Sequence, residues 1–370
     1  MQYRIYEQRA MLELRVLKAK NGDCILLSWN GDGSVRNILI DGGKSSVYKS
    51  GPLKGELYKA LKLIEDSGQR IDKLILTHVD DDHIGGILSG FKSGELLNKL
   101  CDKVWFNSGR LIKEAFEDSS LPENELKLER INVKSGKTSI QQGVSLEDRI
   151  SELGIWDSKL IESGYSYDFY GAKITVLSPQ KENLAKLLHK WKKEAPKSIT
   201  AGKATDYQWS LEDLAINDNF VSDKSVHNGS SIAILFEYDS KRILLLGDSH
   251  DGVICDGLLN LKDELGNSIS PDNKLKIDYT KLSHHGSEYN TSMSFLNLID
   301  CKNFIISTDG SAHGLPNKRT ISRITRNVSD ANILFNYPTL IGRIFTKGEV
   351  EELETLGISI TSCDEMIDVR

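Results

Sequence analysis

The pattern of apolar and polar residues predicts three consecutive strands at the start of the chain. Residues 12–20 (LELRVLKAK) alternate between the two residue types, which is typical of a half-buried strand. Two apolar runs, 24–29 and 36–43, follow the turn signals NGD and NGDG. We therefore expect a β-meander over residues 12–43 that ends in the sequence IDGG.

A helix and a buried strand follow the meander. Residues 55–67 place Leu57, Leu61 and Ile64 at helical spacing, and residues 71–78 (IDKLILTH) form a buried strand. This order predicts a βαβ unit, in which ligands gather at the carboxyl ends of the strands. The motif THVDDDH begins at that end.

The rest of the chain alternates between regular and irregular segments. Residues 107–165 are polar and of helical or loop character, and residues 195–226 have few apolar anchors. We interpret both as insertions in a single domain spanning residues 1–370. The other expected elements are strand pairs at 167–179 and 230–248, strands at 278–287 and 302–310, helices at 181–194 and 291–299, and a loop that becomes a helix at 313–324.

Composition indicates a soluble globular protein. The net charge of −6 and the pI of about 5.8 argue against a surface coated in basic residues, although a local basic patch stays possible. The five cysteines are scattered and form no CxxC pair, which suits reduced thiols in the cytoplasm. The N-terminal segment has no continuous apolar stretch, and no apolar run approaches the ~20 residues of a membrane span. We expect a cytoplasmic protein without membrane contact.

The motif THVDDDH concentrates negative charge in a way that calls for a cation. Asp80, Asp81 and Asp82 are adjacent and repel one another, and His78 and His83 flank them without adding permanent charge at pH 7. A solvated acidic loop is the alternative interpretation. The buried strand before the motif and the IGG after it favour a divalent metal site instead.

Two further segments end predicted strands with residues that bind metals. Asp248 follows the run ILLLG, and His284 and His285 follow DYTKLS. Alone, Asp248 could cap a turn and the histidine pair could be structural. Together with the first motif they predict two metals at one edge of two sheets, sharing a carboxylate and a hydroxide.

At these residues the sequence resembles the metallo-β-lactamase fold superfamily, and more closely the soluble hydrolase domain of the ComEC/Rec2 competence proteins. The resemblance covers most of residues 12–330 in the family's order. The membrane portion of ComEC proteins is not matched. The resemblance therefore concerns one domain and does not imply a role in DNA uptake. The matching stretches are NGDCILL, NILIDGG, LTHVDDDHIGG, ITVLSP, HNGSSIAILF, ILLLGDS, KLSHHGSEYNTSMSFL and the HGLP loop.

The resemblance implies an α/β fold, the four-layer αββα sandwich, with metals at one edge. It places His78 and Asp80 on the first metal and Asp82 and His83 on the second, with Asp248 bridging the two. Asp80 stands where the family usually has a histidine. An oxygen-rich first site tolerates Mn²⁺ or Mg²⁺ as well as Zn²⁺, so the identity of the two divalent ions stays open.

One of His284 and His285 would complete the second site. Because successive strand side chains point to opposite faces, only one of them is expected to face the metals. The family pattern favours His285, beside the Gly286 turn, as the ligand and His284 as its neighbour.

Other residues receive supporting roles from the resemblance. Asp41 would lie beside the metals, and His227 or Asn228 stands nearest to a family histidine that has no clear counterpart here. His313, in the HGLP loop, would line the active site, and either His313 or a metal-bound water would protonate the leaving group. The remaining candidates, for holding a substrate phosphate, are Lys44, Ser287 and Ser292.

These expectations favour a metal-dependent phosphodiesterase or nuclease that hydrolyses DNA or RNA by attack of a metal-activated hydroxide, with Asp82 and Asp248 essential for catalysis. The alternatives are a small-molecule phosphoesterase or lactone hydrolase, a metal-loaded but inactive scaffold, and an effector subunit activated by a protein partner. The two insertions would gate the site or dock such a partner.

Overall fold

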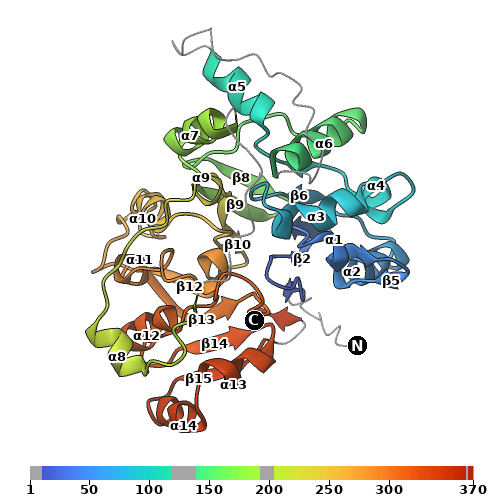
Figure 1. Cartoon of the computed structure of the whole chain (residues 1–370). Coiled ribbons are helices and arrows are strands. Elements are labelled where there is room, and N and C mark those ends of the chain that lie inside the picture. The colour runs from blue at the N-terminus through green and yellow to red at the C-terminus, as the bar shows by residue number, and fades with distance from the viewer. Residues whose placement is uncertain (1–10, 118–138, 192–203, 364–365, 370) are drawn as a thin grey trace, which may run out of the picture.

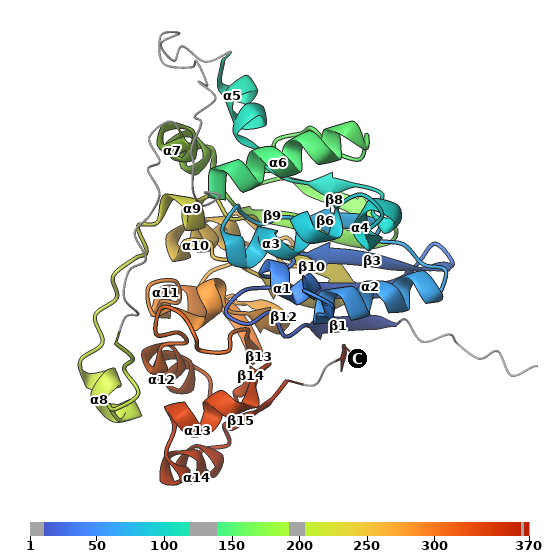
Figure 2. The same ribbon diagram turned by 45° about the vertical axis from the view of Figure 1, so that its right-hand side comes forward.

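Two sheets lie face to face, and helices cover their outer faces (Figure 1; Figure 2). The structure is a computed structural model that describes residues 11–117, 139–191, 204–363 and 366–369. The first ten residues, and the stretches 118–138 and 195–203 of the two expected insertions, lie outside these ranges.

The first sheet contains the predicted meander and βαβ unit. Its order is β16-β1-β2-β3-β6-β7, with β1 to β3 antiparallel and β3 parallel to β6. Helix α2 (Glu56–Asp66) makes the connection from β3 to β6. Both predictions are confirmed. The strands are β1 Leu12–Val16, β2 Ile25–Gly31, β3 Ser34–Ile40, β6 Lys73–Ile75, β7 Val104–Trp105 and β16 Ile367–Asp368.

The second sheet is larger, with the order β15-β14-β13-β12-β11-β10-β9-β8. It is antiparallel from β8 to β11 and parallel from β11 to β15. The strands β14 and β15 were not predicted, and they extend the parallel part. The bounds are β8 Ser166–Phe169, β9 Ala172–Ser178, β10 Ala233–Tyr238, β11 Lys241–Leu245, β12 Leu275–Lys281, β13 Ile299–Ile306, β14 Asn332–Phe335 and β15 Ser359–Ser362.

Short helices complete the two outer layers. In both views, α3 and α6 lie together over the first sheet, whereas α10, α11 and α12 lie over the second (Figure 1; Figure 2). The small strands β4 (Lys49–Ser50) and β5 (Leu53–Lys54) form a separate hairpin. The remaining helices are α1 Ser45–Tyr48, α3 Asp81–Gly90, α4 Leu96–Leu100, α5 Gly109–Glu117, α6 Ser139–Glu152, α7 Lys181–Trp191, α8 Leu211–Ile216, α9 Val226–Gly229, α10 Asp251–Leu259, α11 Met293–Leu296, α12 Lys318–Asn327, α13 Ile341–Ile344 and α14 Lys347–Thr355.

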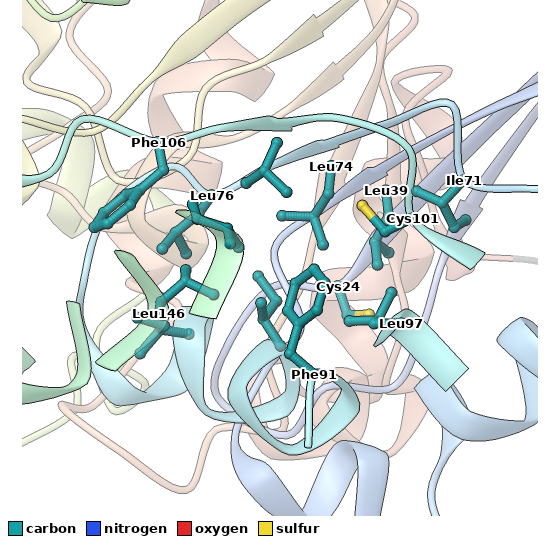
Figure 3. Packing of buried hydrophobic residues seen from close by; sticks show 14 of the residues in the cluster. Cys24, Leu39, Ile71, Leu74, Leu76, Phe91, Leu97, Cys101, Phe106 and Leu146 are labelled. Atoms are coloured by element: carbon teal, nitrogen blue, oxygen red, sulfur yellow. The ribbon is translucent and has the colours of Figure 1, made fainter. Parts of the chain in front are cut away.

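Alternation along the strands divides the apolar side chains among three layers. On β3, Ile38 and Ile40 point between the two sheets, whereas Leu39 points to the helices of the first outer layer. On β11, Ile243 points between the sheets and Leu244 to the second outer layer. Figure 3 shows the first outer cluster. Three apolar layers between four layers of structure confirm the αββα sandwich.

The described helices include none that is both long and apolar enough to cross a membrane. The five cysteines form no disulfide, and three of them are buried.

Candidate metal centre

The motifs converge because three chain segments leave the sandwich at one edge. The THVDDDH segment follows β6 of the first sheet, and Asp248 and the histidine pair follow β11 and β12 of the second. The parallel strands β11 and β12 end at the same edge of their sheet.

The acidic motif lies at the start of a helix. Asp80 is the N-cap residue of α3, and Asp81, Asp82 and His83 form its first turn. Carboxylates are stabilised at a helix N-terminus by the helix dipole, which offsets part of their mutual repulsion. Asp81 turns to the outer layer, where it accepts a hydrogen bond from Gln142 of α6 at 2.7 Å.

Glycines bring the start of α3 close to the IDGG segment. A Cβ on Gly86 would lie 2.0 Å from the carbonyl oxygen of Gly42, and a Cβ on Gly22 would lie 1.8 Å from that of Asp82. Neither contact is sterically possible. The IGG sequence after DDDH therefore allows the helix to place His83 against the end of β3.

The imidazole rings of four histidines surround the carboxylate of Asp248. Its Oδ2 atom lies 3.6 Å from Nε2 of His83 and 3.8 Å from Nε2 of both His78 and His284. Its Oδ1 atom lies 3.7 Å from Nε2 of His285. These separations exceed hydrogen-bond length and leave space for ions between the groups.

Hydrogen bonds on the far side of three rings fix their tautomers. His83 Nδ1 donates to Asp41 at 2.7 Å, and His285 Nδ1 donates to the carbonyl of Ser307 at 2.9 Å. The Thr77 hydroxyl donates to Asp41, so it accepts from Nδ1 of His78 at 3.0 Å. In its neutral form, each ring thus turns an Nε2 lone pair toward Asp248, which is the arrangement of metal-ligating histidines.

The donor atoms fit divalent cations. Nε2 of His78, His83 and His285 and Oδ1 of Asp248 are buried without a hydrogen-bond partner in the described chain. Burying such atoms unsatisfied costs about 1–3 kcal/mol each. Ligand atoms of His78, His83 and Asp248, and of Asp82, His83 and His285, lie within 4.8 Å of one another. Imidazole nitrogen and carboxylate oxygen together suit Zn²⁺ or Mn²⁺.

The histidine pair does not continue strand β12, so the alternation expected for a strand does not apply. β12 ends at Lys281, and both histidines adopt left-handed φ angles, 46° for His284 and 56° for His285, in a 3₁₀ turn. Consequently both rings face Asp248. They differ in exposure, because the His284 side chain is 24% exposed and that of His285 is 4% exposed.

His227 and Asn228 line the same centre from α9. His227 Nδ1 lies 2.7 Å from Oδ1 of Asp80, and the Asn228 amide donates to Asp223 at 2.7 Å. Asp223 also lies 3.5 Å from Nδ1 of His284. Asp41 lies beneath His83 as expected for a residue that orients a ligand.

The remaining candidates differ in exposure, and two of them already form hydrogen bonds within the chain. His313 is exposed in its loop, and Lys44 is half-buried as the N-cap of α1. Ser287 is buried and accepts from the amide of Tyr289. Ser292 donates to Asp251 at 2.7 Å and caps α11, so its hydroxyl has no proton to offer a phosphate.

A buried ion pair under the centre was missed by the sequence analysis. The ammonium of Lys281, which is 0% exposed, contacts Asp23, which is 1% exposed, and Asp23 lies 3.5 Å from Nδ1 of His285. Burial alone would raise the pKa of Asp23, but Lys281 holds this pKa well below its usual range. A lysine inside the apolar strand before HH was the available signal. Nearby, Asn21 donates to Asp82 at 2.6 Å.

Two imidazoles have raised pKa values in the metal-free protein. For His284, burial would lower the pKa, but the carboxylates of Asp248 and Asp223 outweigh it and raise the pKa to about 9. For His83, burial would also lower the pKa, but the carboxylates of Asp248 and Asp41 raise it well above its ordinary value.

The family comparison agrees with this geometry. Residues 19–94 match the model of the metallo-β-lactamase superfamily, a segment that contains both the IDGG sequence and the DDDH motif. This segment of the chain is therefore similar to the metallo-β-lactamase superfamily. The closer likeness to ComEC proteins stays a prediction. No curated protein sequence matches the chain.

Several solved structures are similar to this chain at low identity. The metallo-β-lactamase fold protein YhfI from Bacillus subtilis is 12% identical, with a TM-score of 0.40 over 97% of this chain and 99% of that one. Zn²⁺-bound PqqB from Methylobacterium extorquens is 11% identical, with a TM-score of 0.39 over 93% and 86%. The hydrolase AbOPH is 14% identical, with a TM-score of 0.30; the match covers 61% of this chain and 56% of AbOPH, about half its length.

Metal binding should release protons. At pH 7 the raised pKa values keep His83 and His284 protonated in the metal-free protein, and a protonated ring has no lone pair for a cation. Calorimetry with Zn²⁺ or Mn²⁺ at pH 7, in buffers of different ionisation enthalpy, should report release of up to about two protons and an affinity that rises with pH. The His284→Ala variant should release about one proton fewer than the wild type when it binds the metal. Binding heats independent of the buffer would contradict the assignment.

Breaking the buried ion pair should destabilise the protein. Lys281→Met leaves Asp23 charged and unpaired inside the sandwich, so urea unfolding of the metal-free protein should show a loss of about 3–5 kcal/mol. Replacing both residues, with Asp23→Leu added, should recover much of that loss. The matched control is Lys302→Met, because Lys302 and Asp330 are 58% and 50% exposed. If Lys281→Met costs no more than this control, the pair has no structural role.

The two histidines of the turn should differ in their contribution to metal binding. His285 is almost fully buried and braced by Ser307, so His285→Ala should lose metal and all activity. His284→Ala should weaken both by about 10–100-fold, as is usual for residues that support a ligand. Metal content by elemental analysis and the rate of each variant test this, and the opposite order would assign the ligand to His284.

Proposed function

We propose that this chain is a metal-dependent phosphodiesterase that cleaves DNA or RNA with two divalent cations. The observation that carries the proposal is the orientation of three buried imidazoles, each hydrogen-bonded through Nδ1 and with its Nε2 turned to the single carboxylate of Asp248. These Nε2 atoms and Oδ1 of Asp248 are buried without a hydrogen-bond partner among the described residues, and bound cations would supply the missing partners.

The donor set divides into two groups that share Asp248. His78 and Asp80 would hold one cation, and Asp82 and His83 would hold the other together with the histidine turn. When bound, the cations would lower the pKa of water and neutralise charge that develops on a phosphate.

Oxygen ligands favour phosphate chemistry over other hydrolysis. Asp80 occupies the position where the resembling family usually has histidine, and it lies 3.9 Å from Nε2 of His78. Carboxylates suit Mn²⁺ and Mg²⁺, the hard cations that pair with phosphate oxygens. The Asp80 side chain is 28% exposed, so this side of the centre is open to a substrate.

The chain's own residues would orient the substrate and supply a proton. The loop with His313 packs on the histidine turn, where the amide of Asn317 donates to the carbonyl of Gly286 at 3.0 Å. His313, in this loop, is the candidate for the group that protonates the leaving oxygen. Lys44, which begins α1 beside the IDGG segment, is the candidate for a phosphate contact.

A second candidate function is an effector that a protein partner activates. Helix α6 belongs to the insertion 107–165, and its Gln142 holds Asp81 in the first turn of α3. A partner that displaces α6 would therefore reach the acidic motif directly.

A substrate panel tests the proposed activity. Plasmid, single-stranded DNA, RNA and bis-p-nitrophenyl phosphate should be assayed with Mn²⁺, Mg²⁺ or Zn²⁺, beside a lactone and a phosphocholine ester. We expect cleavage of at least one polynucleotide and of the synthetic diester, with two metals per chain by elemental analysis. Cleavage of only the lactone or the phosphocholine ester would favour a small-molecule hydrolase. Activity that appears only with a partner would favour the effector.

Single substitutions in the acidic motif should separate ligands from bystanders. Asp82→Ala and Asp248→Ala should each lower kcat on the best substrate by more than 100-fold, because a lost ligand costs more than a lost supporting residue. Asp81→Ala is the matched control, since Asp81 is bonded to Gln142 away from the centre. Near wild-type turnover by Asp82→Ala or Asp248→Ala would overturn the catalytic assignment.

A further inference from the structure

A cavity lies next to the metal centre, and none of the candidate metal ligands lines it. It encloses about 250 Å³ between α7, α9 and the N-terminus of α10. Its lining residues are Asn183, Lys186, Asp223, Lys224, Val226 and His250.

The cavity presents positive charge and a hydrogen-bond donor. Lys186 and Lys224 are exposed and come from two different segments, and within the described residues neither forms an ion pair. The amide of Asn183 is only 8% exposed and packs against Gly229, where a Cβ would lie 3.1 Å from its nitrogen.

The one acidic residue in the wall offsets only part of this charge, because it stands against two lysines. Asp223 accepts hydrogen bonds from the amide of Ser225 at 2.8 Å, from Asn228 at 2.7 Å and from Asn290 at 3.2 Å. The oxygens of Asp223 are thus held by the chain's own donors on the side that faces the metal centre.

One imidazole ring separates the cavity from the metal centre. Asp223 in the cavity wall lies 3.5 Å from Nδ1 of His284, whose Nε2 lies 3.8 Å from Asp248. The wall is also fixed in place, because His250 Nε2 donates to the carbonyl of Ser225 at 2.8 Å. A ligand that spans both places must be extended and must carry more than one anionic group.

We infer that this cavity binds a phosphate group of a polynucleotide, adjacent along the strand to the phosphate at the metal centre. The inference rests on the proposed function and extends it to a second phosphate subsite. Lys186 and Lys224 act as point charges toward the phosphate oxygens, and Asn183 donates a hydrogen bond. The subsite distinguishes a polynucleotide from a small diester, which has no second phosphate.

The test compares two double variants that have the same change in charge. Lys186→Gln with Lys224→Gln removes both cations of the cavity, whereas Lys302→Gln with Lys347→Gln removes two exposed lysines on β13 and α14, far from α7 in both views (Figure 1; Figure 2). Binding of a fluorescent 12-nucleotide single-stranded DNA is followed by anisotropy in the Asp248→Asn background, which prevents turnover. Hydrolysis of bis-p-nitrophenyl phosphate is measured separately on otherwise wild-type protein.

The cavity variant should bind the oligonucleotide about 5–20-fold more weakly at low salt, and the slope of log K against log salt should fall by about 0.7 for each phosphate that is no longer neutralised by a lysine. Its hydrolysis of bis-p-nitrophenyl phosphate should stay within about twofold of wild type, because that ester cannot reach the cavity. The control variant should match the wild type in both assays.

The two assays separate failure of the subsite from failure of the proposed function. Equal oligonucleotide binding by the two double variants, or no binding by the parent protein, would overturn the phosphate subsite whether or not the diester is hydrolysed. Selective loss of binding in the cavity variant, without diester hydrolysis by the wild type, would retain the subsite and reject the phosphodiesterase.

Discussion

The interaction on which the rest of the site depends is the confinement of Asp248 among four imidazole rings at the edge of the sandwich. A buried carboxylate is costly unless a cation or hydrogen-bond donors compensate it. Here the nearest ring nitrogens lie 3.6 to 3.8 Å away, and three of the rings are held in place by hydrogen bonds through Nδ1. Without an ion, compensation comes from protons on His83 and His284, which explains why their pKa values are raised.

Support for this cluster comes from residues that would otherwise have no reason to be polar. Asp41 lies at the end of a buried strand. The hydroxyl of Thr77 donates to Asp41 and accepts from His78. Asp23 and Lys281 place opposite charges under His285. Each of these groups has few other polar partners within reach, because the apolar layers of the sandwich surround it. The rigidity of the centre therefore follows from the packing of the sheets.

Much of the fold could be predicted from the sequence, because alternation and helical spacing report burial directly. The meander, the βαβ unit and the strand pair ending at Asp248 follow from these local patterns. The start of α3 at Asp81 was not predicted, since three adjacent aspartates have low propensity for a helix interior, although Asp is favourable at the N-cap and in the first turn, where these residues lie. The His284 turn depends on left-handed backbone angles that no apolar pattern indicates. Asp23 and Lys281 lie 258 positions apart, and a single sequence holds no information that pairs them.

The division of the donor atoms between the two sheets has a consequence for assembly. His78, Asp80, Asp82 and His83 belong to segments of the first sheet, whereas Asp248 and the histidine turn follow strands of the second. Neither sheet alone completes the cluster, so a cation can be fully coordinated only after the two sheets have stacked. Bound metal would then act as a clasp across the sandwich, adding about 2.7 kcal/mol to its stability at a free concentration 100 times the Kd. The supply of metal during synthesis would thereby influence the fraction of molecules that fold with the two sheets stacked.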